Sequence, residues 1–363
     1  MGKELTSEEK NIREQQKINI EKLLWIAVER HASDIHIVLE RPIQLRINGK
    51  CIFLEDQVFS AEEMKYLIHF LLNDKQKKCL QETGEVTFAF STSQKIRCRA
   101  SIFLQRGYYA AVFHLLGIGI PKAETLKIPQ SVLELYKENQ GLVIVSGASG
   151  SGRTTTLAVL LDRINQEIGG HILTLESPVE YLHVRKKAMI HQRGIGLDVV
   201  NYTSALKAAI REDADVLLVG EAEDAETIEK MITAAEMGHF VFGVMDVVGA
   251  VETIERMTEV FSPEQRKTMQ KRLAYALKAV VSQRLIPIGD EQRAVFDVIL
   301  ADKTVRNLIE EGKTASIKEV MQNEKGMQRM EETIFEWYIQ GKLDREQALR
   351  YVRDASLVEK MLI

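Results

Sequence analysis

The sequence predicts an α/β protein in which a small N-terminal α+β domain precedes a larger domain with a mainly parallel sheet. Three observations support this prediction. Short strand-like runs with a hairpin signal fill the first third of the chain, nearly continuous apolar runs alternate with helical segments after about residue 130, and a glycine-rich loop joins the first of those runs to a helix. A length of 363 residues allows two domains, each with a core of its own.

The first predicted domain covers residues 1–116. An amphipathic helix is expected over 7–31 and a second helix over 61–73, because apolar residues recur there at helical spacing. Asn48-Gly49 indicates a hairpin, since both residues tolerate positive φ. The expected strands are 34–38, 43–47, 51–54, 85–90, 95–103 and 109–116. Their lengths and turn signals favour an antiparallel sheet.

The second predicted domain covers residues 131–363 and follows a linker at 117–130, which opens with Gly117 and contains Pro121. Four buried strands are expected at 142–145, 171–175, 215–219 and 240–244. From about residue 251 the sequence is expected to be helical to the end. In a parallel sheet of this kind, ligands bind at the carboxyl ends of the strands.

The glycine-rich loop after the first of these strands matches the phosphate-binding pattern G-x-x-x-x-G-K-[ST] except that Arg153 replaces the lysine. Three glycines let successive N–H groups face an anion at the positive end of the next helix. Thr154 is placed to offer its hydroxyl to Mg²⁺ bound with a nucleotide. The alternative is a flexible loop without a ligand. The expected nucleotide-binding residues are Gly147, Ala148, Ser149, Gly150, Ser151, Gly152, Arg153, Thr154 and Thr155.

Two acids and one histidine lie next to predicted strands. Glu221 follows the strand that ends near Val219, where a carboxylate can orient or deprotonate an attacking water. The alternative is that Glu221 caps the next helix. Glu176 ends the strand at 171–175, and His239 directly precedes the strand at 240–244; a packing role for His239 stays open.

Composition narrows the class of function. The net charge of −4 argues against a general nucleic-acid binder. Three scattered cysteines form no C-x-x-C pair and agree with a reducing cytoplasm. The polar N-terminus is unlike a signal peptide, and no apolar run reaches the roughly 18 residues of a membrane span. A membrane connection is therefore expected to go through a partner.

The order of motifs resembles that of the secretion and type IV pilus ATPases, and specifically the PilT-like retraction branch. The resemblance runs from about Leu23 to the C-terminus. It rests on A-S-D-I-H at 32–36, the arginine-bearing strand and hairpin at 97–107, the phosphate loop, T-L-E-S-P-V-E-Y at 174–181, the acidic strand at 211–221, G-H-F-V-F-G at 238–243, and V-R-N-L-I at 305–309.

This resemblance implies a PAS-like domain followed by a RecA-like domain, assembled as a homohexamer that binds ATP with Mg²⁺. ATP hydrolysis would drive pilus disassembly through an inner-membrane platform protein, from the cytoplasmic face. Glu221 would be the general base and Thr154 a Mg²⁺ ligand. Glu176 and His239, in the family's acidic and histidine motifs, would also be catalytic residues. Phosphate charge would be stabilised by Arg97, Arg99 and Arg106.

The chain departs from the family pattern mostly near the chemistry. Arg153 replaces lysine, Ser177 replaces aspartate, Glu223 replaces arginine and Asp246 replaces the second histidine. Glu310 replaces the arginine that ends the C-terminal motif, and Glu223 and Glu310 are candidates to meet new arginine partners such as Arg153 or Arg193. Two readings stay open: a working, slow retraction ATPase, or a nucleotide-binding, hydrolysis-poor subunit that regulates or assembles with a second pilus ATPase. An extension or competence ATPase and a DNA motor are less favoured, because the zinc cysteines and a basic stripe are missing.

Overall fold

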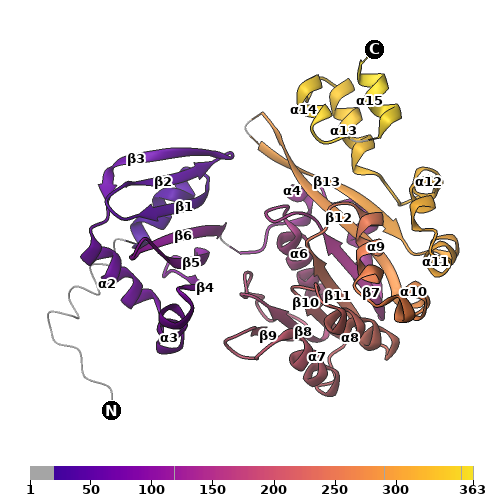
Figure 1. The fold of residues 1–363 in the computed structure, drawn as a ribbon, viewed down its shortest axis with the longest axis horizontal. Coiled ribbons are helices and arrows are strands. Elements are labelled where there is room, and N and C mark those ends of the chain that lie inside the picture. The colour runs from indigo at the N-terminus through magenta and orange to yellow at the C-terminus, as the bar shows by residue number, and fades with distance from the viewer. Residues whose placement is uncertain (1–19, 118, 290, 353, 363) are drawn as a thin grey trace. The chain divides into compact units, whose positions relative to one another are not determined.

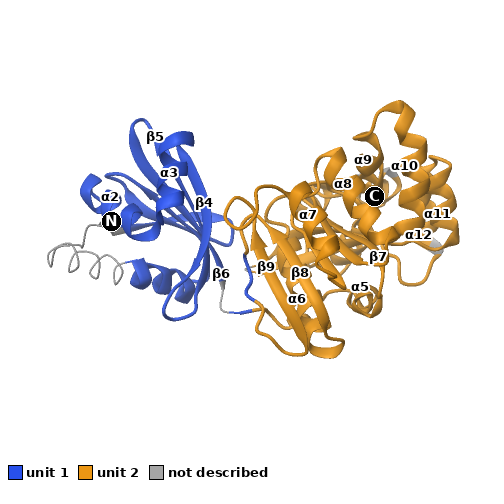
Figure 2. Ribbon diagram, turned by 90° about the horizontal axis from the view of Figure 1, so that it is seen from below, with its two compact units in different colours: residues 1–119, 180–182 blue, residues 120–179, 183–363 orange. Residues whose placement is uncertain are grey.

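The computed structural model describes residues 20–117, 119–289, 291–352 and 354–362. It divides into two compact units, one of residues 1–119 with 180–182 and the other of residues 120–179 with 183–363 (Figure 2). The sequence-based boundary falls three residues earlier. Most of the segment expected to be a linker belongs to the second unit, because Ile120, Ala123 and Leu126 pack against its core.

The first unit is a six-stranded antiparallel sheet in the order β3-β2-β1-β6-β5-β4. Residues 20–29 are helical, and the part of the expected N-terminal helix at 7–19 lies outside the described residues. The strands and helices are β1 (Ala32–Val38), β2 (Pro42–Ile47), β3 (Lys50–Val58), α2 (Ala61–Leu71), α3 (Asp74–Thr83), β4 (Glu85–Ser91), β5 (Arg97–Gln105) and β6 (Tyr108–Gly117). All six expected strands are present in this unit.

Alternation of side chains gives the first sheet one apolar and one polar face. Ile35, Leu45 and Phe113 are fully buried and pack with Leu24 of the N-terminal helical segment and Leu67 of α2. Residues one position away in β1 and β6 point to the opposite face. The core of this unit therefore lies between the sheet and its helices.

The second unit is built around a seven-stranded sheet in the order β13-β12-β7-β11-β10-β8-β9 (Figure 1). All neighbours are parallel except β12 and β13. Its first elements are α4 (Ala123–Leu126), α5 (Gln130–Leu133), η1 (Glu134–Lys137), β7 (Gly141–Ser146), α6 (Arg153–Glu167), β8 (Gly170–Glu176), β9 (Ala188–Gly194), α7 (Tyr202–Arg211), β10 (Val216–Val219), α8 (Ala225–Glu236) and β11 (Phe240–Met245).

The expectation of an entirely helical region after about residue 251 was wrong. β12 and β13 form a long antiparallel hairpin that extends the parallel sheet, because an apolar run of this length fits a buried strand as well as a helix. The C-terminal elements are α9 (Ala250–Glu259), α10 (Pro263–Ala276), β12 (Leu277–Ile288), β13 (Glu291–Leu300), α11 (Lys303–Glu310), η2 (Thr314–Ser316), α12 (Ile317–Asn323), α13 (Met330–Ile339), α14 (Arg345–Leu349) and α15 (Ala355–Leu362).

Both faces of the second sheet are covered. Leu142 and Ile144 of β7 pack on the side of α7 to α12, whereas Val143 and Val145 pack on the side of α5 and α6. Burial on both sides explains why these strands are continuously apolar rather than alternating. A further cluster joins α13, α14 and α15 to Ile286 and Val295 of the hairpin. The predicted α/β fold class is confirmed.

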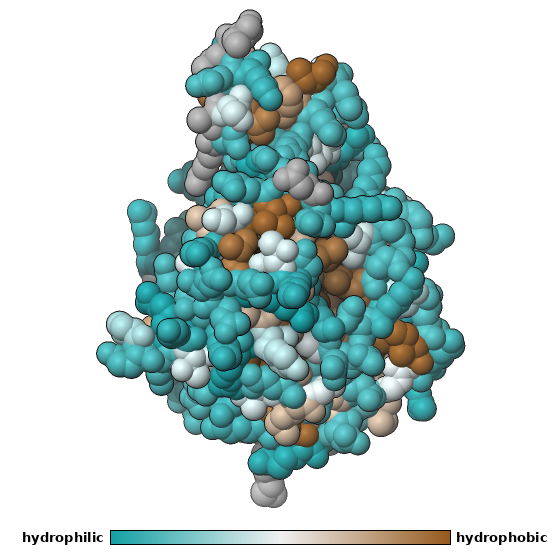
Figure 3. All heavy atoms as spheres, turned by 90° about the vertical axis from the view of Figure 1, so that its right-hand side faces the viewer, coloured by the Kyte–Doolittle hydropathy of each residue, from teal (hydrophilic) through white to brown (hydrophobic). Residues whose placement is uncertain are grey.

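The surface view in Figure 3 is mainly hydrophilic, and the hydrophobic side chains visible in it gather in small, separate patches. Scattered apolar side chains of this kind are normal for a surface that faces water. Among the described residues, none of the helices combines the length and the apolar character that a membrane crossing requires.

Candidate active site

The glycine-rich loop links the end of β7 to the start of α6 and is shaped by three glycines with positive φ: Gly147 (148°), Gly150 (76°) and Gly152 (88°). A Cβ atom on Gly147 would lie 2.3 Å from the carbonyl oxygen of Gln283 on β12, and one on Gly152 would lie 2.8 Å from the Gln283 Nε2. Glycine is required at these two positions because the loop passes directly against β12.

The loop has polar atoms without an internal partner. Gly152 is the N-cap of α6 and makes no side-chain capping bond. Ser151 is buried at 4% exposure, and among the described residues its Oγ has no hydrogen-bond partner. An uncapped helix N-terminus with a buried, unpaired hydroxyl beside it fits a bound phosphate oxygen.

A groove of about 630 Å³ adjoins the loop. Its floor comes from Gly152 and Thr155 on one side and from Gln283 and Leu285 of β12 on the other. Phe296 of β13 and Trp337 of α13 add aromatic surface to the wall. The size and mixed polarity of the groove suit a small organic group attached to the phosphate.

Glu221 lies two residues beyond β10, at the same sheet edge as the loop. Asp224, rather than Glu221, caps α8, because its side chain accepts the Thr227 N–H at 2.9 Å. The helix-cap interpretation of Glu221 is therefore wrong. Partial loss of hydration raises the pKa of the Glu221 carboxyl, the Glu223 and Asp246 carboxylates raise it further, and Arg153 opposes the rise. A carboxyl of raised pKa is suited to accept a proton.

Glu176 ends β8 and is buried at 7% exposure. The Thr174 hydroxyl donates a hydrogen bond to its carboxylate at 2.6 Å, and the Gln192 Nε2 donates another at 3.3 Å. Tyr202, the first residue of α7, lies near both acids: burial raises its pKa, and the Glu221 and Glu176 carboxylates add to the rise. The sequence interpretation missed Tyr202, whose only local signal is the Asn201 cap before it.

Arg153, the first residue of α6, turns toward β11. Its Nη1 donates to the Met245 carbonyl oxygen at 2.8 Å and forms an ion pair with the Asp246 carboxylate. Asp246 was noted in the sequence only as a departure from the family pattern, and not as a partner of Arg153. The suggested arginine partners of Glu223 and Glu310 are not formed among the described residues.

Arg193 and Glu310, the other two residues considered for these pairs, have other partners. Arg193 pairs with Glu212 at 3.1 Å, and Glu310 pairs with Lys271 at 3.7 Å. Arg153 and Glu310 are therefore paired with residues other than those considered, and no ion pair of Glu223 is formed among the described residues.

The structure does not bring His239 to this edge of the sheet. His239 stands before the first residue of β11, while the phosphate loop, Glu176, Glu221 and Asp246 follow the last residues of their strands. Its Nδ1 lies 2.6 Å from the Ala214 carbonyl oxygen, and its own carbonyl oxygen accepts from the Gly141 N–H. The expected position of His239 beside the nucleotide edge was wrong for this sheet, because strand β11 separates the two edges; a catalytic role of His239 stays a prediction.

The three arginines of the first unit do not form one cluster. Arg97 and Arg99 lie two residues apart on the same face of β5, whereas Arg106 lies in the turn at the other end of that strand. Within this unit, the Arg99 Nη1 pairs with the Glu180 carboxylate at 2.6 Å, and the Arg97 Nε donates to the Glu180 carbonyl oxygen at 2.9 Å.

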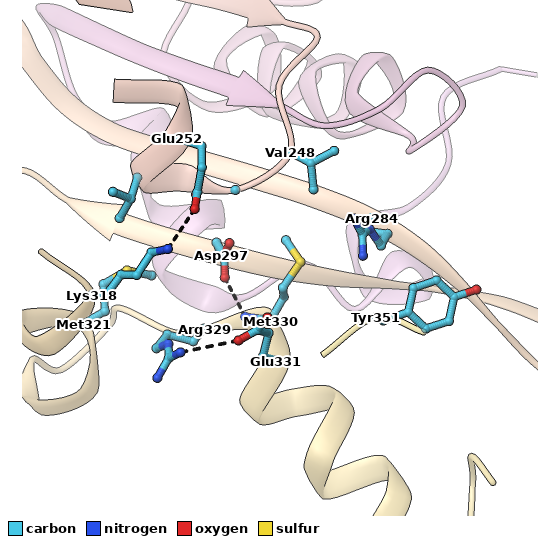
Figure 4. A pocket seen from close by; sticks show the side chains of 12 residues that line it. Val248, Glu252, Arg284, Asp297, Lys318, Met321, Arg329, Met330, Glu331 and Tyr351 are labelled. Atoms are coloured by element: carbon cyan, nitrogen blue, oxygen red, sulfur yellow. Dashed lines mark hydrogen bonds and ion pairs between the residues drawn. The ribbon is translucent and has the colours of Figure 1, made fainter. Parts of the chain in front are cut away.

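A smaller polar pocket shares no lining residue with the groove beside the phosphate loop (Figure 4). Lys318 pairs there with Glu252, and Arg329 pairs with Glu331 and Asp354. Asp297 of β13 accepts the Met330 N–H at 2.7 Å. Internal pairing accounts for most of these charges: the Lys318–Glu252 pair joins α12 to α9, and the Asp297–Met330 hydrogen bond joins α13 to β13.

Comparison with known proteins identifies the family. The family model described as type II/IV secretion system protein matches residues 9–356. The chain belongs to this family. The type IV pilus retraction ATPase PilT of Pseudomonas aeruginosa is 34% identical, over 91% of this chain and 97% of the relative, and the type IV pilus ATPase PilU of the same organism is 31% identical, over 95% and 91%.

Among solved structures, the pilus retraction motor PilT with bound ADP is similar to this chain with a TM-score of 0.84 and 37% identity, over 93% of this chain and 98% of that one. Within its family, the chain is therefore a PilT-like secretion and pilus ATPase relative with a RecA-like fold. The resemblance inferred from the motifs is confirmed.

Proposed function

We propose that this PilT-like chain is an ATP-binding motor of type IV pilus retraction, coupling ATP hydrolysis to pilus disassembly through a platform protein of the inner membrane. The observation that carries the proposal is the phosphate loop. Gly147 and Gly152 have no room for a side chain beside Gln283, and the Ser151 hydroxyl is buried without a partner among the described residues. The bound ADP of the similar PilT structure supports the same ligand class.

Binding of ATP would use both parts of the site. Backbone N–H groups of the loop and the start of α6 would receive the phosphates, and the groove lined by Phe296 and Trp337 would hold the base and ribose. Thr154, the second residue of α6, would present its hydroxyl to Mg²⁺. The metal would neutralise charge on the phosphates.

Glu221 would act as the general base of hydrolysis, taking a proton from the attacking water. Its raised pKa favours this role, and Glu176, anchored by Thr174, would help to orient the water. Arg97 and Arg99 would stabilise phosphate charge in a homohexamer, in which a neighbouring subunit can present them. Exchange of their bonds to Glu180 for bonds to phosphate would be required.

The alternative is a nucleotide-binding, hydrolysis-poor subunit that regulates or assembles with a second pilus ATPase. The observation that favours it is the contact between Arg153 and Asp246, which holds the loop cation at β11. Misplacement of a charge-stabilising group by about 1 Å costs on the order of 100-fold in rate. Both proposals place the protein at the cytoplasmic face of the membrane through its partners.

The test is steady-state ATP turnover by the purified chain, with nucleotide binding measured on the same sample. Glu221→Gln should abolish turnover and keep binding, while Glu264→Gln, an exposed carboxylate on α10, serves as the matched control. Turnover that survives Glu221→Gln would contradict the assigned base. Binding without turnover in the unmodified chain would support the regulatory alternative, and no binding at all would refute both.

A further inference from the structure

Arg153 begins α6, after the loop that follows β7, and Asp246 directly follows β11, the parallel neighbour of β7; their side chains meet at the carboxyl ends of these two strands. Met245 at the end of β11 is in register with Ser146 at the end of β7, so Asp246 is level with the first glycine of the loop. The Arg153 side chain is 13% exposed and that of Asp246 is 50% exposed. The guanidinium is therefore held in a protected position, and its anionic partner stays at the solvent edge.

The Arg153 Nη1 makes both contacts, donating to the Met245 carbonyl oxygen at 2.8 Å and meeting the Asp246 carboxylate. These two contacts occupy both hydrogens of Nη1, so this nitrogen can donate to a phosphate only by giving one of them up; Nη2 and Nε keep the other three N–H donors. A guanidinium keeps its charge throughout and forms planar, directed hydrogen bonds, which makes such a contact persistent.

Three carboxylates act on the same small region. The Glu221 charge interacts with Glu223, Asp246 and Arg153. A triphosphate that enters the loop adds further negative charge and must compete with Asp246 for the guanidinium. Of these carboxylates, Asp246 is the one recorded in an ion pair with Arg153 among the described residues.

We propose that Asp246 is a positioning residue that acts as an internal competitor for the Arg153 guanidinium, so that a nucleoside triphosphate must displace Asp246 to engage the Nη1 end of this cation. This inference rests on the proposed nucleotide binding. It assigns to Asp246 a role in nucleotide specificity. A triphosphate has one more phosphate that can hold the guanidinium than a diphosphate has, so competition from Asp246 weakens the binding of a triphosphate more. Removal of the Asp246 charge should strengthen triphosphate binding although it removes a native contact.

The experiment measures two quantities on the full chain: the affinities for ADP and for a non-hydrolysable ATP analogue by calorimetry, and the melting temperature without nucleotide. Asp246→Asn should increase the affinity for the ATP analogue about three- to tenfold, change the affinity for ADP less, and lower the melting temperature. Opposite signs of the two effects distinguish competition from a structural role, which would weaken both binding and stability.

Glu223→Gln is the matched control, since it removes the same charge from the surroundings of Glu221 without removing an ion pair to Arg153. Glu223→Gln should change the affinities for both nucleotides by the same factor and leave the melting temperature unchanged. In an Arg153→Gln background, Asp246→Asn should have no more effect than Glu223→Gln. These outcomes support the proposal.

Equal effects of Asp246→Asn and Glu223→Gln on the ATP analogue, or weaker binding in Asp246→Asn, would overturn the proposal while leaving the proposed function standing. If the folded parent chain and its Arg153→Lys variant bind neither nucleotide, the proposed function fails and this inference fails with it. The parent affinities therefore separate the two failures.

Discussion

The Thr156 hydroxyl on α6 donates a hydrogen bond to the Gln283 Oε1 on β12 at 2.7 Å, and both side chains are buried. These residues lie 127 positions apart in the chain. The same Gln283 presents its Nε2 to Gly152 and its carbonyl oxygen to Gly147. One residue of β12 therefore braces the helix that follows the phosphate loop and limits the room of the loop itself.

Gln283→Leu should lower the free energy of unfolding by about 1–3 kcal/mol, because the buried Thr156 hydroxyl loses its acceptor. The measurement is urea unfolding. The matched test is the double variant with Thr156→Val, which removes both partners and should cost less than the sum of the two single changes. Additive costs would show that this hydrogen bond does not couple α6 to β12.

Gly147→Ala should destabilise the protein more than Gly150→Ala. Both glycines have positive φ, but a Cβ on Gly147 would lie 2.3 Å from a backbone oxygen, whereas one on Gly150 meets no atom within 4 Å. Gly150→Ala should cost about 1–2 kcal/mol from its backbone conformation alone. Thermal or urea unfolding of the two variants measures the loss of unfolding free energy in each. Equal losses would contradict the close approach of the loop to β12.

The acid limb of the pH profile of ATP turnover should report Glu221. Its pKa is raised by lost hydration and by the Glu223 and Asp246 carboxylates, so the active, deprotonated base is lost at a higher pH than for an ordinary glutamate. Glu223→Gln should move this limb to lower pH. Glu264→Gln, which does not contribute to the shift, should leave the limb where it is, and a common response of both variants would argue against Glu221 as the titrating group.

Asp297 should make stability depend on pH. Burial raises its pKa from 3.8 to about 6, so between these values the folded state binds more protons than the unfolded state. Its contribution to stability therefore falls as pH rises from about 4 to about 6. The upper limit of this effect is about 3 kcal/mol.

Asp297→Asn keeps an acceptor for the Met330 N–H, the hydrogen bond drawn in Figure 4, and removes the titration. The difference in unfolding free energy between this variant and the parent should shift in favour of the variant as pH rises through that window. Measurement of urea unfolding at several pH values gives this difference directly. A difference that stays constant with pH would contradict the raised pKa.

Local patterns were sufficient for much of the molecule. Strand-like runs predicted all six strands of the first unit, since alternation and the Asn48-Gly49 turn depend only on neighbouring residues. The phosphate loop was also predicted, because its spacing and its glycines carry the geometry within eight residues. Periodicity failed at β12 and β13, where an apolar run bounded by a turn is consistent with either a helix or a strand.

What the sequence determined by itself was the fold class, the loop and the acids that follow the strands, all of which are encoded by residues close together in the chain. Strand direction and packing decided the rest. Direction places His239 at the edge opposite Glu221, and packing selects Asp246 as the partner of Arg153 and Gln283 as the brace of the loop. These contacts join residues about 90 to 130 positions apart, and a pairing at that separation exists only once the sheet has brought the strands together.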